Sequence, residues 1–153
     1  MVRKGIAWAL VAGLMAMALA LASGCGGGEE TTASLTRSQF VKQANAMCKR
    51  QEEARNEVIR AAIEGKDQSK VLPLAQREKV ILEILPPYEE VPKKLKALGA
   101  PEGDEAQVEA IIKAMEKAAR EVKANPRAAL ESTKQFFQGN KLSSEYGLTE
   151  CVV

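Results

Sequence analysis

The sequence predicts an all-α protein, folded as an antiparallel four-helix bundle and closed by one disulfide. Apolar residues recur at helical spacing in four segments, which Gly- and Pro-rich breaks separate. The apolar–polar alternation typical of a strand never runs for more than a few residues. Cys48 and Cys151 lie near the two ends of the helical region, residues 35–153, which we expect to form a single domain.

The first predicted helix begins after Thr36, where Gln39 stands at the position that completes a capping box. Gly65 is expected to end this helix, because glycine adopts the backbone conformation that helix ends favour. Gln51 and Arg55 interrupt the apolar stripe. The stripe, which should face the core, consists of Phe40, Ala44, Met47, Cys48, Val58, Ile59 and Ala62.

The second helical region begins between Ser69 and Pro73, and its apolar period continues to Leu98. Pro86-Pro87 and Pro92 interrupt it, and each proline removes a backbone donor. Two separate helices would not need to share one phase, so we expect a continuous helix that is kinked at Pro86-Pro87 rather than a loop. Gly99 to Gly103 should end this element.

The third and fourth predicted helices both have recognisable starts. Asp104 and Gln107 form a second capping-box pattern. Asn125 can cap the fourth helix, with Pro126 in its first turn, and Gly139-Asn140 is expected to end it. The apolar stripe of the third helix consists of Val108, Ile111, Ile112, Met115, Ala118, Ala119 and Val122. The fourth helix carries Ala129, Leu130, Phe136 and Phe137.

The amino-terminal segment has the pattern of an export signal. Arg3 and Lys4 precede an uncharged, mostly apolar run from Gly5 to Ala22, which ends in Ser23-Gly24-Cys25. A charged start, an apolar middle and small residues before a cleavage site define a secretory signal. The segment resembles a bacterial lipoprotein signal, with Ala22 standing where that motif usually has Leu.

This resemblance implies that residues 1–24 are removed and that Cys25 receives a diacylglycerol thioether and palmitate. Two or more acyl chains hold a protein stably on a membrane, whereas one does so only marginally. Residues 25–34 are rich in Gly, Glu and Thr, which predicts a flexible tether. An uncleaved anchor and ordinary secretion are the alternatives. All three place the domain outside the cytoplasm, and we favour the lipid-anchored form on the extracytoplasmic face of the cell membrane.

The charge balance argues against a nucleic-acid-binding protein. The chain has 22 Lys and Arg against 20 Asp and Glu, and removing Arg3 and Lys4 leaves 20 of each. A neutral domain lacks the basic face that nucleic-acid binding requires. The chain also contains no histidine, the commonest general base and metal ligand near neutral pH. We therefore expect no metal and no cofactor.

The number of cysteines predicts a disulfide. With Cys25 acylated, Cys48 and Cys151 remain as a pair in an oxidising compartment. A redox-active pair usually has Cys-x-x-Cys spacing, and two thiolates without histidine make a poor metal site. We therefore favour a structural bond. It closes a loop of about 100 residues, for which chain entropy gives about 4.7 kcal/mol as an idealised upper figure.

No catalytic constellation is visible in the sequence. The neighbours in Glu52-Glu53 and in Glu89-Glu90 do not face each other on a helix, so we interpret them as solvated surface. Glu102 to Glu105 lacks the alternating ligand spacing of a calcium loop. We find no phosphate-binding glycine loop, zinc signature or nucleophile elbow. The sequence therefore predicts that the protein is not an enzyme.

A candidate ligand groove lies where the second helix is expected to kink. Tyr88 follows Pro86-Pro87 directly, and a bend there could open the bundle core, where helical bundles hold their ligands. The alternative is ordinary core packing, which is the more frequent use of such residues. The candidate lining residues are Tyr88, Met47, Met115, Phe136 and Phe137.

Three motifs spread along the predicted domain resemble one group of proteins. The motifs are Phe40-Val41-x-x-Ala44-x-x-x-Cys48, Leu95-x-x-Leu98 with Pro101-x-x-Asp104, and Tyr146-Gly147-Leu148-x-x-Cys151. The pattern is similar to that of small secreted or lipid-anchored actinobacterial proteins. The resemblance implies a fold, a location and the same disulfide, but no activity. We therefore expect a lipid-anchored binding or interaction module with an unidentified protein or small-molecule partner; the alternative is a structural envelope lipoprotein without a ligand.

Overall fold

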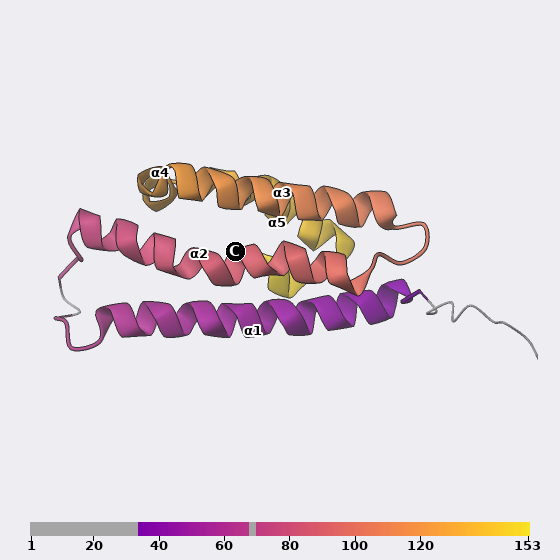
Figure 1. Ribbon diagram of the computed structural model, residues 1–153, viewed down its shortest axis with the longest axis horizontal. Helices are drawn as coiled ribbons and strands as arrows, with labels where there is room; N and C mark the ends of the chain where they lie inside the picture. Colours follow the sequence, from indigo (N-terminus) through magenta and orange to yellow (C-terminus); the bar gives the residue numbers. More distant parts are fainter. Residues whose placement is uncertain (1–33, 68–69) are drawn as a thin grey trace, which may run out of the picture. The chain divides into compact units, whose positions relative to one another are not determined.

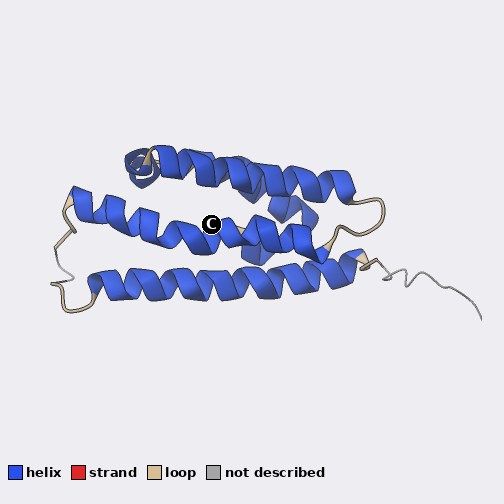
Figure 2. Ribbon diagram, viewed as in Figure 1, coloured by secondary structure: helices blue, strands red, loops and turns tan. Residues whose placement is uncertain are grey.

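Five α-helices and two short 3₁₀ helices make up the computed structural model, which describes residues 34–67 and 70–153. These residues contain no strand (Figure 2), which confirms the predicted all-α class. The predicted signal and the predicted tether up to residue 33 lie outside the described ranges. Among the helices that are described, none is long and apolar enough to span a bilayer.

Three long helices lie side by side, and consecutive ones run in opposite directions (Figure 1). They are α1 (Arg37–Ile63), α2 (Leu74–Leu98) and α3 (Glu105–Ala124), with α2 in contact with both of the others. The residues that follow α3 form shorter elements, of which α5 packs on α3 and η2 packs on α1. These elements are α4 (Pro126–Glu131), the 3₁₀ helix η1 (Lys134–Phe136), α5 (Phe137–Tyr146) and the 3₁₀ helix η2 (Thr149–Cys151).

The start of α1 follows the predicted capping box. The Gln39 backbone N–H donates to Thr36 Oγ1 at 3.3 Å, and the Thr36 N–H donates to Gln39 Oε1 at 2.9 Å. Two backbone donors that the first turn leaves unpaired are thereby satisfied. The helix ends at Ile63, just before Gly65, whose φ of 69° lies in the left-handed region.

Helix α2 is continuous through all three of its prolines, as the persistent apolar phase predicts. It begins after Pro73 and ends at Leu98, where Gly99 has a φ of 73°. A proline in a helix interior leaves one carbonyl without its usual donor and crowds the preceding turn. Contacts with α1 and α3 along the length of α2 offset that cost.

Helix α3 begins after Asp104, but the predicted capping box does not form. The Asp104 side chain makes no capping hydrogen bond, and its φ of −103° and ψ of 2° depart from the extended backbone typical of a capping residue. Its carboxylate accepts a hydrogen bond from the Tyr146 hydroxyl instead, at 2.7 Å. The prediction was wrong because a residue 42 positions away competes for the same oxygen.

The predicted fourth helix is divided into pieces. Its start is confirmed, since the Ala128 N–H donates to Asn125 Oδ1 at 3.0 Å and Pro126 occupies the first turn. It stops at Glu131, because Ser132 has an extended backbone with φ −155° and ψ 146°. Gly139, the expected end, instead lies buried inside α5, so that part of the prediction was wrong.

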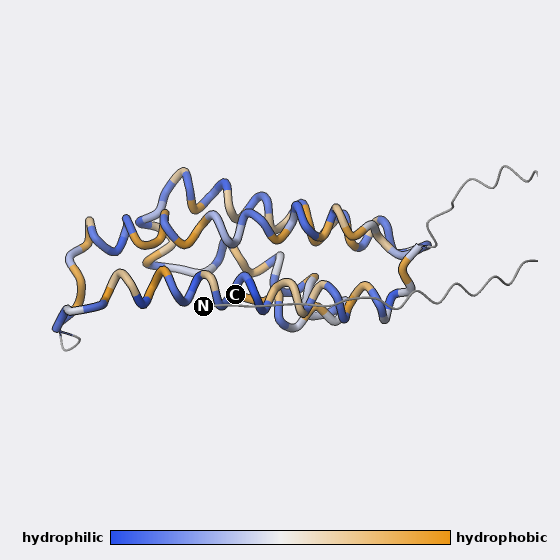
Figure 3. The backbone as a smooth tube through the Cα atoms, turned by 60° about the horizontal axis from the view of Figure 1, so that its bottom comes forward, coloured by the Kyte–Doolittle hydropathy of each residue, from blue (hydrophilic) through white to orange (hydrophobic). Residues whose placement is uncertain are grey.

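Apolar side chains gather in a main core and in a smaller second cluster. Figure 3 shows apolar and polar residues interspersed along each of the described helices, as amphipathic helices require. The main core consists of Phe40, Ala44, Met47, Cys48, Val91, Leu95, Val108, Ile111, Ile112, Met115, Tyr146, Leu148 and Cys151. The second cluster consists of Leu85, Ala119 and Val122, with Ile81, Tyr88, Ala129 and Phe136 packed against it.

The predicted disulfide is confirmed. Cys48 on α1 is bonded to Cys151 on η2, across 103 positions of the sequence, with the two Cα atoms 5.0 Å apart. Both cysteines are buried in the main core. The bond therefore fixes the last segment of the chain to the first long helix.

Two asparagines hold the same last segment by hydrogen bonds. Asn45 Nδ2 donates to the Gly147 carbonyl at 3.0 Å, and Asn45 Oδ1 accepts from the Glu150 N–H at 3.0 Å. Asn140 Nδ2 donates to the Val153 carbonyl at 2.6 Å, and its Oδ1 accepts from the Val153 N–H at 3.1 Å. Each asparagine thus uses both the nitrogen and the oxygen of its side-chain amide to bind backbone groups of the last described segment.

Candidate functional site

An apolar cavity of about 140 Å³ opens beside the second cluster. Residues from four α-helices, from the 3₁₀ helix η1 and from the end of the described chain form its walls, so it depends on tertiary packing. Eight of the ten lining residues are apolar or aromatic, and Arg55 is the only charged one. The lining residues are Arg55, Ile81, Ile84, Leu85, Tyr88, Val122, Ala129, Thr133, Phe136 and Val153.

Helical spacing on α2 builds one wall of this cavity. Ile81, Ile84, Leu85 and Tyr88 lie three or four positions apart, so their side chains share one face of the helix. The opposite wall comes from the divided fourth segment, in which the break after Glu131 lets the chain return through η1. The break after Glu131 therefore contributes to the cavity, whose wall would differ if the fourth segment were one straight helix.

Tyr88 and Phe136 meet at the cavity wall. Their ring centroids are 5.4 Å apart, and the ring planes cross at 79°, which is the edge-to-face arrangement that aromatic pairs prefer. Burial raises the pKa of the Tyr88 phenol above its ordinary value, because the charged form loses its hydration. The phenol is neutral at physiological pH with or without this shift, and the shift only extends its neutral range to higher pH.

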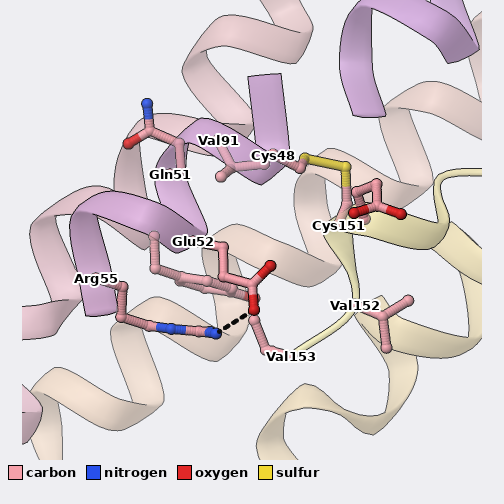
Figure 4. Close-up of a pocket in the computed structure, with 10 residues that line it drawn as sticks. Cys48, Gln51, Glu52, Arg55, Val91, Cys151, Val152 and Val153 are labelled. Atoms are coloured by element: carbon pink, nitrogen blue, oxygen red, sulfur yellow. Dashed lines mark ion pairs between the residues drawn. A yellow bond between two sulfur atoms is a disulfide. The ribbon is translucent and has the colours of Figure 1, made fainter. Parts of the chain in front are cut away.

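Arg55 brings a positive charge to the edge of the cavity. Its side chain is 26% exposed, and its Nη2 lies 3.6 Å from Glu52 Oε1 in an ion pair within α1. Figure 4 shows this pair and Val153 around a smaller hollow of about 30 Å³, next to the disulfide. Arg55, Tyr88 and Val153 line both spaces, so the two spaces adjoin at these residues.

The five residues that the sequence analysis proposed as a groove lie in three different environments. Tyr88 and Phe136 line the cavity together. Met47 and Met115 belong to the main core, where they are 5% and 1% exposed. Phe137 points to solvent and is 68% exposed. The structure thus brings two of the five together and separates the other three from them.

Of the ten lining residues, the sequence predicted only Tyr88 and Phe136 as site residues, and Arg55 and Val153 are among the eight that it missed. Arg55 left a signal, because it interrupts the apolar stripe of the first helix at a position that turns out to be half-buried. Val153 left none, since it reaches the cavity only through the disulfide and the Asn140 hydrogen bonds. Contacts of this kind depend on pairing across the whole domain.

A polar cluster of Arg37, Asp104 and Tyr146 joins α1, the residue before α3, and α5. The Tyr146 hydroxyl donates to Asp104 Oδ2 at 2.7 Å, and the Arg37 Nε lies 3.8 Å from the same oxygen. The Arg37 guanidinium carbon also lies 4.4 Å from the centre of the Tyr146 ring. Burial, and then the hydrogen bond to the Asp104 carboxylate, raise the pKa of Tyr146 above its ordinary value. All the contacts in this cluster connect parts of the fold.

The motifs that carry the actinobacterial resemblance pack against one another. Phe40 meets the Tyr146 ring edge-on, with centroids 6.0 Å apart. Gly147 has a φ of 100°, and a Cβ added there would lie 3.7 Å from Val41. Leu148 and Leu95 are fully buried. These residues form the main core and its closing turn, so the resemblance concerns packing and does not point to a reactive site.

The acidic pairs singled out in the sequence lie in separate surroundings. Glu52 pairs with Arg55, and Glu90 Oε1 accepts a hydrogen bond from Lys93 Nζ at 2.7 Å, which lowers the pKa of Glu90. Glu102 and Glu105 are exposed. In the part of the chain that the structure describes, no three His, Cys, Asp or Glu side chains are placed to share a metal ion.

The cavity beside Tyr88 has the mostly apolar and aromatic lining that ligand sites commonly have. No protein-family model, curated protein or solved structure matches this chain.

Proposed function

We propose that the protein is an extracytoplasmic binding module, anchored by lipid at Cys25, and that the cavity beside Tyr88 is its ligand site. The signal pattern before Cys25 supports the location. The Cys48–Cys151 bond is in keeping with export, because disulfides persist in oxidising compartments. The resemblance to small secreted actinobacterial proteins fits the same location and is part of this proposal.

The single observation that carries the binding function is the cavity itself. The cavity has a volume of about 140 Å³, and Ile, Leu, Val, Tyr and Phe side chains form most of its walls. Such a space favours an apolar ligand. An engineered apolar cavity of about 150 Å³ stays dry and binds benzene. By the same physics, a ligand of ring size, or a short alkyl segment, fits this space.

We also propose how the fold presents the site. The helices form an antiparallel four-helix bundle, in which α4, η1 and α5 together take the place of the fourth helix. Helix α2 bends at Pro86-Pro87, because these prolines leave the carbonyls of Leu82 and Glu83 without their usual helical donors. A bend one residue before Tyr88 would widen the space next to its ring.

A neutral apolar probe tests the binding function. We expect benzene to shift the methyl NMR signals of Ile81 and Val122, and Ala129→Leu to abolish these shifts by filling the cavity. Ala128→Leu is the matched control, because Ala128 is exposed on the same helix and should leave binding unchanged. Benzene shifts that persist in Ala129→Leu would contradict the assignment of the cavity as the site.

Substitution of Cys25 tests the anchor. In a bacterium that lipidates exported proteins, Cys25→Ser should lose the acyl mass and remain as uncleaved precursor or leave the membrane fraction. Ser23→Ala serves as the control, because it keeps a small residue and the cysteine. Mass spectrometry and detergent partitioning measure both effects. An unchanged mass and unchanged membrane extraction of Cys25→Ser would refute lipidation.

A structural envelope lipoprotein without a ligand is the second candidate. It is favoured by the contacts of Arg37, Asp104 and Tyr146, which join elements of the fold to one another. The benzene experiment bears on both candidates, since a cavity that fails to accept the probe would leave only the structural one. We do not propose an enzymatic activity.

A further inference from the structure

We propose that the cavity takes the apolar end of an anionic amphiphile of the fatty-acid class, whose single carboxylate binds Arg55. This inference rests on the proposed binding function and adds the chemistry of the ligand. It follows from three features of the described residues: the donors of Arg55, the acidic residues around it, and the size and opening of the cavity.

Arg55 has hydrogen-bonding capacity that the fold does not use. A guanidinium carries five N–H donors in a planar fork that matches a carboxylate. Within the described ranges, its one polar contact is the 3.6 Å ion pair with Glu52, and it makes no side-chain hydrogen bond. The Arg55 side chain is only 26% exposed, so an anion that reaches it gains more than it would at a fully solvated arginine.

The acidic residues near Arg55 limit the charge that a ligand head can carry. Glu52 is 48% exposed and can turn toward water when a ligand carboxylate takes up the guanidinium. Glu150 lines the adjoining hollow and is exposed. Two carboxylates beside one arginine repel a dianion more strongly than a monoanion. The surroundings therefore favour a carboxylic acid over a phosphate monoester.

The dimensions of the cavity favour an amphiphile over a wholly buried molecule. Its volume of about 140 Å³ accepts one ring or a short alkyl segment, but not a long chain. Val153 lines the cavity and is 40% exposed, so it continues the apolar surface to the rim. Arg55 and Tyr88 line both the cavity and the hollow beside it, where the polar head would lie.

Three probes with the same tail and different heads test this inference at pH 7 on the full mature chain. We expect sodium octanoate to bind about tenfold more tightly than 1-octanol, because a hydrogen bond between two charged groups is stronger than one to a neutral hydroxyl. Octylammonium should bind more weakly than 1-octanol. Isothermal titration calorimetry measures the affinities, and the methyl signals of Ile81 and Val122 report whether the tail enters the cavity.

Substitution of Arg55 identifies the group that holds the head. In Arg55→Gln the affinity for octanoate should fall about tenfold, to the level of 1-octanol, whose own affinity should not change. Arg55→Lys keeps the charge without the fork and should give an intermediate affinity. Arg55→Lys also tests the role of Arg55 if the Gln variant fails to fold. Arg127→Gln is the matched control, because Arg127 is 61% exposed, pairs with Glu131 and lies outside the cavity lining.

Each result decides between this inference and the proposed function. Equal affinities for octanoate and 1-octanol, or an octanoate affinity that both Arg55 variants leave unchanged, would overturn the role of Arg55 and leave the apolar site standing. Failure of benzene and of all three octyl probes to shift the cavity methyl signals would overturn both. Tighter binding of octylammonium than of octanoate would assign the opposite charge to the ligand.

Discussion

Tyr146 holds three elements together with different parts of one side chain. Its hydroxyl binds Asp104 ahead of α3, its ring face lies under Arg37 of α1, and Phe40 packs edge-on against it. Tyr146 itself is the last residue of α5. Asp104 could be identified from the sequence as the residue before a helix, but its real partner could not, because nothing local marks Tyr146 as the donor.

Replacement of Tyr146 by Phe should weaken the fold without changing its shape. The variant keeps the ring and loses the hydrogen bond to Asp104, so we expect the free energy of unfolding to fall by about 1–2 kcal/mol. Urea denaturation at pH 7 measures the loss. Phe40→Leu provides a comparison that perturbs the ring contact and keeps the hydrogen bond. An unfolding free energy unchanged in Tyr146→Phe would show that the hydroxyl binds water in the unfolded chain as favourably as it binds Asp104 in the fold.

Stability should also decline at alkaline pH. The pKa of Tyr146 and that of Tyr88 are raised above 10.0 in the fold, since burial opposes the phenolate and the Asp104 carboxylate adds to this at Tyr146. Their contribution is complete below pH 10 and is lost as the pH rises toward the folded-state pKa values. Tyr146→Phe should therefore lose stability less steeply above pH 10 than the parent protein, while Tyr88 maintains part of the slope.

At the scale of the elements, local chemistry predicted the boundaries of the three long helices but not the division of the fourth segment. The starts at Thr36 and Asn125 depend on side chains within three residues, and both are present. The break at Ser132 has no Gly or Pro to announce it, and the residue stays extended in its tertiary setting. Gly139 predicts the end of a helix, yet α5 continues through it because α3 covers this residue.

In helix α1, the residues of the predicted apolar stripe are buried to different depths. Its fully buried residues, Phe40, Ala44, Met47 and Cys48, all lie in its first half. Val58, in the second half of the same predicted stripe, is only half-buried. The stripe predicted the helix and its inward face, but the depth of burial depends on which neighbours cover each turn. Arg55 lies in this less covered half, where a charge can remain at the edge of the cavity.

At the scale of the whole molecule, one covalent bond and two asparagines position the last described segment. Cys151 is bonded to α1, Asn45 binds Gly147 and Glu150, and Asn140 binds Val153. The number of cysteines predicted the bond. The hydrogen bonds were not predictable, because asparagine on a helix surface gives no indication of a partner about 100 positions away.

Removal of the disulfide should cost stability and leave the helices formed. For Cys48→Ala combined with Cys151→Ala, we expect a loss of about 2–5 kcal/mol, because the unfolded chain regains the freedom that the closed loop denies it. Guanidinium denaturation measures the loss, and far-UV circular dichroism checks the helical content. Val152→Ala is the control for a change next to the bond. A denaturation midpoint unaffected by the double substitution would show that the bond contributes nothing to stability.

The cavity wall includes Arg55 from the first long helix and Val153 from the last described segment. The disulfide keeps these two positions near each other in the unfolded chain as well, but only the folded chain arranges them around an apolar cavity, so a guest that fills the cavity binds the native state alone. Such a guest stabilises the native state by mass action, and a hundredfold excess over its dissociation constant adds about 2.7 kcal/mol to stability. If the protein is exported as proposed, it would thus be most durable while a guest occupies the cavity.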